Sequence, residues 1–266
     1  MNMQKSVVIK YGGNAMTEPD IRKKVLAAAV KLKNKGIIPV LVHGGGPYIN
    51  KALNERGRES KFLKGLRCTD KDTMEVVIQV LCGSVNKGLT AEIESLGSRA
   101  IGLSGADGGM IKAVRYSDDK ELGFAGKVSS IQSDVIELAL NNGYIPVISS
   151  VGYDIHGQAY NINADMVAGH IGAAVNSERV IFMTDVDGVF LDKDLPESLM
   201  SELSVKKAEE MIDSGVIAGG MIPKVKSCME VLELGIKSAV IINGKKPEQL
   251  MAAALGEYAG TRFFEE

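Results

Sequence analysis

Short apolar runs alternate with helical patterns along nearly all of this 266-residue chain, and this alternation constrains the fold most. Each run is almost continuously Val, Ile or Leu, as in parallel strands that are covered on both faces. The predicted strands are Ser6–Lys10, Ile37–Val42, Arg99–Leu103, Tyr144–Ser149, Arg179–Thr184 and Ser238–Ile242. The predicted helices are Asp20–Asn34, Thr69–Ser95, Ser129–Asn142, Ala164–Val175, Val205–Asp213 and Met221–Leu234. The pattern predicts an α/β fold, a three-layer α/β/α sandwich with a mostly parallel central sheet.

Two segments interrupt the alternation. Ile111–Lys127 reads as hairpin strands that project from the main sheet, and Gly157–Asn163 reads as a strand arm that leads into a helix. The long Thr69–Ser95 pattern allows a break near its internal glycines, Gly83 and Gly88. No low-complexity linker divides the chain, so we expect two tightly joined lobes, residues 1–177 and 178–266.

Composition narrows the class of protein. Net charge is −2 with both signs interspersed, which argues against a nucleic acid partner and against an anionic membrane surface. No run approaches the roughly 20 apolar residues that a membrane helix needs. The cysteines are far apart and the histidines lack metal-ligand spacing, so we expect reduced thiols, no protein-bound metal and a cytoplasmic location.

Three glycine loops point to phosphate. Lys10–Gly13 and His43–Gly46 each follow a predicted strand, and Gly219–Lys224 opens a predicted helix. Glycine lets backbone N–H groups approach an anion, and ligands of open α/β sheets bind beyond the carboxyl ends of strands. A single Gly-Gly pair after a strand is more often a plain tight turn, but lysines at two of the loops favour a phosphate cradle. The spacing matches neither a P-loop nor a dinucleotide-binding fingerprint.

Three polar segments supply further candidates. Asn161, Asn163 and Asp165 alternate where an arm passes into a helix; one residue would suffice as an N-cap, and the others could hold a polar substrate. Arg67 could grip a carboxylate through two parallel hydrogen bonds, although a surface arginine is the commoner case. Thr184–Val189 follows a strand and could face a nucleotide, or it could be a simple turn at its Asp-Gly pair.

In this order, the segments resemble the amino acid kinase family over nearly the whole chain. The matching segments are Lys10–Gly13, His43–Pro47, Gly65–Asp70, Gly123–Val128, Asn161–Ala168, Thr184–Val189, Gly219–Lys224 and Gly260–Thr261. The Gly65–Asp70 and Asn161–Asp165 segments are most similar to the branch that phosphorylates N-acetylglutamate. The resemblance implies the amino acid kinase fold and transfer of the γ-phosphoryl group of ATP to the side-chain carboxylate of N-acetyl-L-glutamate, in arginine biosynthesis.

The resemblance also implies a role for each candidate residue. Lys10 and Lys224 would be catalytic and stabilise the transferring phosphoryl group, with Asp165 holding both lysines. The substrate would be bound by Gly45, Gly46, Arg67, Asn161 and Asn163. ATP, which carries Mg²⁺, would be bound by Gly12, Gly13, Thr184, Asp185, Val186, Asp187, Gly188, Val189, Val216, Ile217 and Ala218. This agrees with the chemistry, because an acceptor carboxylate is already ionised at neutral pH and needs no catalytic base.

Two alternatives stay open at this point. Lys127 is a cation where the family more often has an acidic residue, which leaves room for an acetylaminoadipate-type kinase of lysine biosynthesis. A non-catalytic amino acid or nucleotide sensor on the same fold is the alternative from another class. By the same resemblance we expect a homodimer. Because residues 1–5 precede the first strand without a long helix, we expect it to be insensitive to arginine.

Overall fold

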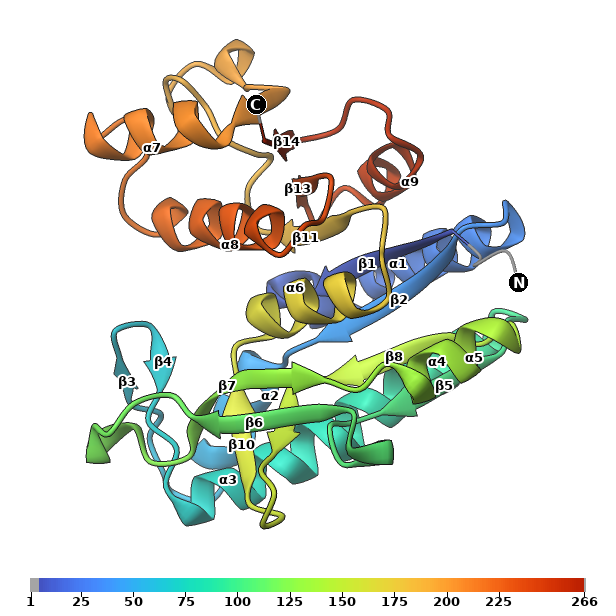
Figure 1. Ribbon diagram of the computed structural model, residues 1–266, viewed down its shortest axis with the longest axis vertical. Coiled ribbons are helices and arrows are strands. Elements are labelled where there is room, and N and C mark those ends of the chain that lie inside the picture. The colour runs from blue at the N-terminus through green and yellow to red at the C-terminus, as the bar shows by residue number, and fades with distance from the viewer. Residues whose placement is uncertain (1–4, 266) are drawn as a thin grey trace.

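The computed structural model describes residues 5–265, and of Asn14 the backbone alone. Its centre is an eight-stranded sheet (Figure 1). In spatial order the strands are β12 (Glu202–Ser204), β14 (Thr261–Phe264), β13 (Ala239–Asn243), β11 (Val180–Thr184), β1 (Ser6–Tyr11), β2 (Ile38–His43), β8 (Ile145–Ser149) and β5 (Ala100–Leu103). Within the described residues every pairing is parallel except β13 with β14. All six predicted strands are confirmed, each to within one residue at either end.

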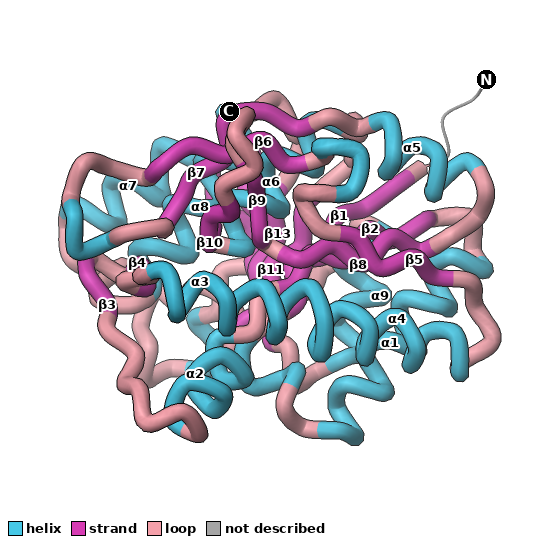
Figure 2. Tube along the Cα trace, turned by 90° about the horizontal axis from the view of Figure 1, so that it is seen from below, coloured by secondary structure: helices cyan, strands magenta, loops and turns pink. Residues whose placement is uncertain are grey.

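Helices cover both faces of this sheet (Figure 2). One face carries α1 (Pro19–Asn34), α4 (Asn86–Ser95) and α9 (Pro247–Leu255); the other carries α5 (Asp134–Asn141), α6 (Ala164–Ala174) and α8 (Met221–Glu233), with α7 (Val205–Asp213) beside α8. Each face has its own apolar cluster, because the strands present buried side chains to both sides. The predicted three-layer sandwich is confirmed.

The predicted Thr69–Ser95 helix is continuous from Lys71, and it is not broken at a glycine. It consists of α3 (Lys71–Ile78), the π-helical segment η2 (Gln79–Val85) and α4. Asp70 caps its start, since its side chain accepts a hydrogen bond of 2.8 Å from the Thr73 N–H. Gly83 lies within the π-helical segment, so the local irregularity there widens the helix instead of ending it.

A small closed sheet stands beside the main one, as the projecting hairpin and arm predicted. It contains β6 (Ile111–Arg115), β7 (Ala125–Ile131), β9 (Val151–Tyr153) and β10 (Ala159–Ile162). The predicted start of the Ser129–Asn142 helix is wrong, because β7 continues to Ile131, which pairs with Ile111. The helix, α5, begins at Asp134.

Several elements were not predicted. They are α2 (Gly46–Asn54), α9, the strands β9, β12 and β14, the hairpin β3 (Phe62–Leu63) with β4 (Leu66–Arg67), and the short 3₁₀ turns η1 (Gly13–Met16), η3 (Asp107–Gly109), η4 (Lys120–Leu122) and η5 (Pro196–Ser198).

The predicted boundary between residues 177 and 178 is crossed by the main sheet, because β1 pairs with β11. Backbone hydrogen bonds also cross this boundary: the Glu178 N–H donates to the Ser6 carbonyl and the Val8 N–H donates to the Arg179 carbonyl, both over 3.1 Å. The division into two lobes stays a prediction.

In the described part of the chain, no helix has the length and apolar character needed to cross a membrane. The expectation about an element ahead of β1 falls on residues 1–4, which lie outside the described residues.

Candidate functional site

The glycine loops meet because their strands are neighbours. β1 lies between β11 and β2, and all three are parallel, so the turns after them leave the same edge of the sheet. Helix α6 packs against these strands, and its first turn lies at this edge. A Cβ atom built on Gly44 would lie 3.5 Å from the Cβ of Ala164, which shows how closely the second glycine loop approaches the start of α6.

The first cavity lies beyond the ends of β1 and β11 and has a volume of about 100 Å³. Its lining residues include Lys10, Gly13, Asp165, Thr184, Asp185, Lys224 and Ser227. Lys10 Nζ lies 3.0 Å from Asp165 Oδ1, and the two side chains are 17% and 23% exposed. Within residues 5–265, Lys224 has no ion-pair partner, so Asp165 pairs with Lys10 alone and not with both lysines as expected. With Asp185, the lining contains two lysines and two aspartates, and its formal charges balance.

The turn after β1 is shaped to expose its backbone. Gly13 has φ of 68°, a conformation that glycine adopts without strain. A Cβ atom on Gly12 would lie 3.2 Å from Lys10 Nζ, so the absence of a side chain lets the lysine lie across the turn. The Lys10 cation and the backbone of Gly13 therefore line the same small space, which suits an anionic group.

The second cavity adjoins the first at the start of α6 and has a volume of about 240 Å³. It is lined by residues of the second glycine loop, of the β3–β4 hairpin and of the β10–α6 junction, among them Gly44, Gly45, Gly46, Phe62, Arg67, Ala125, Ser150, Asn161, Asn163 and Ala164. The five residues that the resemblance assigned to the substrate therefore line one cavity.

Arg67 is the dominant charge in this second cavity. Its side chain donates from Nη1 to Ser60 Oγ over 2.5 Å and from Nη2 to Asn50 Oδ1 over 2.7 Å, and its guanidinium lies 4.8 Å from the centre of the Phe62 ring. The residue is only 8% exposed, and burial lowers its pKa. All these partners are neutral, and no carboxylate in the described residues forms an ion pair with Arg67. A nearly buried cation without an anionic partner is an incomplete arrangement that a carboxylate ligand would complete.

The two asparagines of the junction differ in their contacts. Asn163 caps α6, because its Oδ1 accepts from the Asp165 N–H over 2.9 Å. Asn161 donates from Nδ2 to Thr69 Oγ1 over 3.2 Å. Asn163 is therefore the N-cap residue of α6, as the simpler interpretation of the sequence predicts. This cap fixes the first turn of α6, and with it the Asp165 carboxylate that pairs with Lys10.

His43 supports the second glycine loop and is neutral. It is fully buried; its Nε2 accepts from Asn86 Nδ2 at 3.0 Å, so Nδ1 carries the hydrogen and donates to the Gly44 carbonyl at 2.9 Å. Burial lowers its pKa to about 4. His43 therefore has a structural role in the loop, and its buried ring is not exposed to a substrate that could exchange a proton with it.

The residues predicted to bind the nucleotide fall into two groups. Thr184 and Asp185 line the first cavity together with Gly13. Asp187 instead pairs with Lys246 at 2.6 Å, which together with Asn243 lowers its pKa.

The rest of that set does not line either cavity. The Val189 N–H donates to Thr261 Oγ1 at 2.8 Å and its side chain is buried, while a Cβ atom on Gly188 would lie 2.5 Å from the same oxygen. Val186, Val216, Ile217, Ala218 and Gly12 are likewise absent from the residues lining the two cavities, although the 216–218 segment leads directly into α8 and Lys224.

Sequence reasoning did not predict several polar and aromatic residues that line the two cavities or support them. Asn50, Ser60 and Phe62 reach Arg67 through tertiary contacts that no local pattern indicates. Ser227 could have been found, because it lies three residues after Lys224 on one helix and therefore on the same face.

Comparison with known proteins agrees with this geometry. Residues 5–243 match the model of the amino acid kinase family. The chain is 46% identical over 258 residues to a chloroplastic acetylglutamate kinase of Arabidopsis thaliana, covering 97% of this chain and 74% of that protein. It is 43% identical over 263 residues to an acetylglutamate kinase of Brachyspira hyodysenteriae, covering 98% and 91%.

A solved structure gives the same result for the fold. The protein smu.665 of Streptococcus mutans superposes with a TM-score of 0.81 at 30% identity, covering 98% of this chain and 99% of that one. The family model spans far more than half of the sequence, and the relatives are matched over most of their length. The chain belongs to the amino acid kinase family.

Proposed function

We propose that this protein uses ATP to phosphorylate the side-chain carboxylate of N-acetyl-L-glutamate, which gives N-acetyl-L-glutamyl 5-phosphate in arginine biosynthesis. The observation that carries the proposal is Arg67, a nearly buried guanidinium with neutral partners, one cavity away from the Lys10–Asp165 pair. The names of the relatives, at 43% and 46% identity, support the choice of substrate.

The acyl amino acid occupies the second cavity. Arg67 binds its α-carboxylate through two hydrogen bonds and so acquires the anionic partner that it lacks. Asn161 binds the acetamido end, with Asn163 close by, and the N–H groups of Gly45 and Gly46 face the carboxylate that is to react. This orientation directs the side-chain carboxylate toward the first cavity.

ATP approaches from the C-terminal part of the chain. Its terminal phosphate lies in the first cavity between Lys10, Lys224 and the N–H group of Gly13. Gly12, the neighbouring residue, lets Lys10 lie across the turn. The remainder of the nucleotide lies along Thr184–Val189 and along Val216–Ala218, ahead of α8. Among residues 5–265 no group of three His, Cys, Asp or Glu side chains could hold a metal ion. In this proposal Mg²⁺ would be carried by the phosphates of ATP. Bound there, Mg²⁺ supplies positive charge to the phosphate oxygens.

Catalysis in this proposal consists of positioning and charge. The acceptor carboxylate is ionised at neutral pH, so no general base is required. Lys224 and Lys10 stabilise the negative charge that spreads over the transferring phosphoryl oxygens, and Asp165 holds Lys10 in place.

A coupled assay of ADP release tests the proposal. We expect rapid turnover with N-acetyl-L-glutamate, and slow or no turnover with glutamate, with N-acetyl-aminoadipate or without an acceptor. Preference for the longer N-acetyl-aminoadipate would replace the proposed substrate, and the absence of ADP release with every acceptor would favour a non-catalytic sensor.

We also propose that residues 1–177 bind the acyl amino acid and form a homodimer through their helices, that residues 178–266 bind ATP, and that the protein is cytoplasmic. Light scattering tests the assembly: a mass of twice 28.4 kDa is expected across a dilution series. A monomer at every concentration would contradict the proposed dimer.

A further inference from the structure

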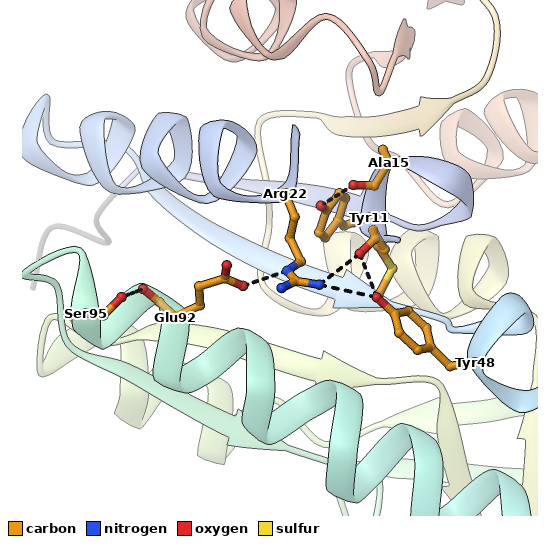
Figure 3. A network of polar contacts seen from close by, with 7 residues as sticks. Tyr11, Ala15, Arg22, Tyr48, Glu92 and Ser95 are labelled. Carbon is orange, nitrogen blue, oxygen red and sulfur yellow. Dashed lines mark hydrogen bonds and ion pairs between the residues drawn. The ribbon is translucent and has the colours of Figure 1, made fainter. Parts of the chain in front are cut away.

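The 3₁₀ turn η1, which follows β1, ends at Ala15 and Met16, and the backbone carbonyl groups of both residues accept hydrogen bonds from side chains (Figure 3). The Tyr11 hydroxyl donates to the Ala15 carbonyl at 2.9 Å. The Met16 carbonyl accepts from the Tyr48 hydroxyl at 2.6 Å and from Arg22 Nη1 at 3.2 Å. A carbonyl oxygen has two lone pairs, so the two donors saturate it. The last turn of η1 is therefore fixed by side chains, in addition to its own backbone.

Arg22 also forms an ion pair with Glu92, through the guanidinium nitrogen Nε that does not contact the Met16 carbonyl. Its Nε donates to Glu92 Oε2 at 2.7 Å, and the two side chains are 27% and 25% exposed. Burial opposes the charge of Arg22, but the hydrogen bond and charge of Glu92 outweigh it, and the pKa of Arg22 is raised. Arg22 stays protonated and keeps donating to the Met16 carbonyl.

The donors come from different elements, and one of these elements belongs to the other glycine loop. Tyr48 lies in the first turn of α2, which begins at Gly46. Arg22 lies on α1 and Glu92 on α4. A displacement of the start of α2 would carry the Tyr48 hydroxyl with it, and the Met16 carbonyl would follow or lose its shortest hydrogen bond.

We propose that Tyr48 and Arg22 are positioning residues that couple the two glycine loops through the Met16 carbonyl. The turn at Gly12–Met16 faces ATP and the loop at Gly44–Gly46 faces the acceptor, so their relative position fixes the distance between the reacting groups. This inference builds on the proposed function. Misplacement of reacting groups by about 1 Å can lower a rate by about 100-fold, so a small shift of one loop is costly.

Tyr48→Phe tests the coupling because it removes the hydroxyl and keeps the ring. The Met16 carbonyl retains Arg22, so the variant is expected to fold with a melting temperature close to that of the wild type. We expect kcat to fall by about 5- to 20-fold, and both KM values to stay within about two-fold. Tyr258→Phe, at an 80% exposed tyrosine, is the matched control and leaves kcat unchanged.

Hydrogen exchange supplies a readout that does not depend on the substrate. In Tyr48→Phe the amides of residues 12–16 are expected to exchange faster, while those of α9 are unchanged. A fall in kcat without faster exchange at residues 12–16, faster exchange throughout the chain, or wild-type behaviour in both measurements would overturn the coupling. If the wild type does not phosphorylate N-acetyl-L-glutamate, the proposed function fails, and the exchange experiment still decides the coupling.

Glu92→Gln extends the test to the far end of the network. It loosens Arg22 without touching the Met16 carbonyl, and the side chains are exposed enough that no fully buried charge is left unpaired. Combined with Tyr48→Phe it should lower kcat by less than the product of the single effects if both act through one carbonyl. Effects that multiply fully would show that the two residues act independently.

Discussion

At the scale of single residues, the cationic side chains of the site differ in whether a carboxylate of the protein pairs with them. Lys10 has a carboxylate partner in Asp165, and this pair holds Lys10 at one place. Arg67 has the neutral partners Asn50 and Ser60, which orient it without cancelling its charge. This difference supports the proposal that Arg67 binds an anionic ligand.

Asn50→Asp tests this assignment by adding a negative charge with almost no change of shape. The new carboxylate would lie at the position of Asn50 Oδ1, 2.7 Å from Arg67 Nη2, and would compete with the substrate. We expect KM for N-acetyl-L-glutamate to rise by about 10- to 100-fold, since charged hydrogen bonds contribute about 1.5–3 kcal/mol, while KM for ATP stays the same. Asn54→Asp, exposed on the same helix, is the control. Equal rises in both KM values would contradict the assignment.

Lys224→Ala removes the cation that has no partner in the first cavity. Because its charge is needed most when the phosphoryl group transfers, we expect kcat to fall by about 100- to 1,000-fold and KM for N-acetyl-L-glutamate to change by less than about three-fold. Lys226→Ala, at an exposed lysine of α8, is the control. Steady-state kinetics measure this effect. If Lys224→Ala keeps most of the wild-type kcat, Lys224 does not stabilise the transferring phosphoryl group.

At the scale of elements, the sequence predicted the strands that carry the site better than the segments between them. β1, β2 and β11 are continuous apolar runs, and their ends coincide with glycine or polar residues. Helix α2 was missed because it starts at Gly46-Pro47 directly after the glycine loop, and only Ile49 and Leu53 are buried, too few to reveal a helical period.

Tertiary pairing decided the remaining differences between prediction and structure. Ser129–Ile131 continue β7 because Ile131 has a partner in Ile111, and a single-sequence pattern does not contain that partner. The strand β12, at the edge of the sheet, and its neighbour β14 have three and four residues, too short for an alternating pattern to be recognised.

His43, the last residue of β2, makes the free energy of unfolding of the protein depend on pH. Burial lowers its pKa to about 4 from the ordinary 6.5, so between these pH values the unfolded chain binds a proton that the folded protein does not. Stability therefore falls as pH falls from 6.5 toward 4, by about 3 kcal/mol in total from this group.

Urea unfolding of the wild type and of His43→Gln at pH 7 and pH 5 measures this contribution. The wild type is expected to lose about 2 kcal/mol more than the variant between the two pH values. His156→Gln, at an exposed histidine, should behave as the wild type does. Equal pH dependence in the wild type and His43→Gln would show that His43 titrates normally in the folded protein.

At the scale of the whole molecule, the two cavities follow from topology. β1 sits in the middle of the sheet with β11 on one side and β2 on the other, so the turns from both halves of the chain converge. The order of motifs along the sequence predicted this convergence. The partners of Arg67 could not be predicted, because Asn50, Ser60 and Phe62 reach it only once α2 and the β3–β4 hairpin have packed.

The most direct test of the account is to identify the product at the acceptor carboxylate. The enzyme is incubated with Mg-ATP, N-acetyl-L-glutamate and hydroxylamine, which converts an acyl phosphate into a hydroxamate, and the mixture is analysed by mass spectrometry. The account predicts the side-chain hydroxamate of N-acetylglutamate in amounts equal to the ADP released, and about 100- to 1,000-fold less of both with Lys224→Ala over the same period. ADP released without any hydroxamate would contradict phosphorylation of that carboxylate.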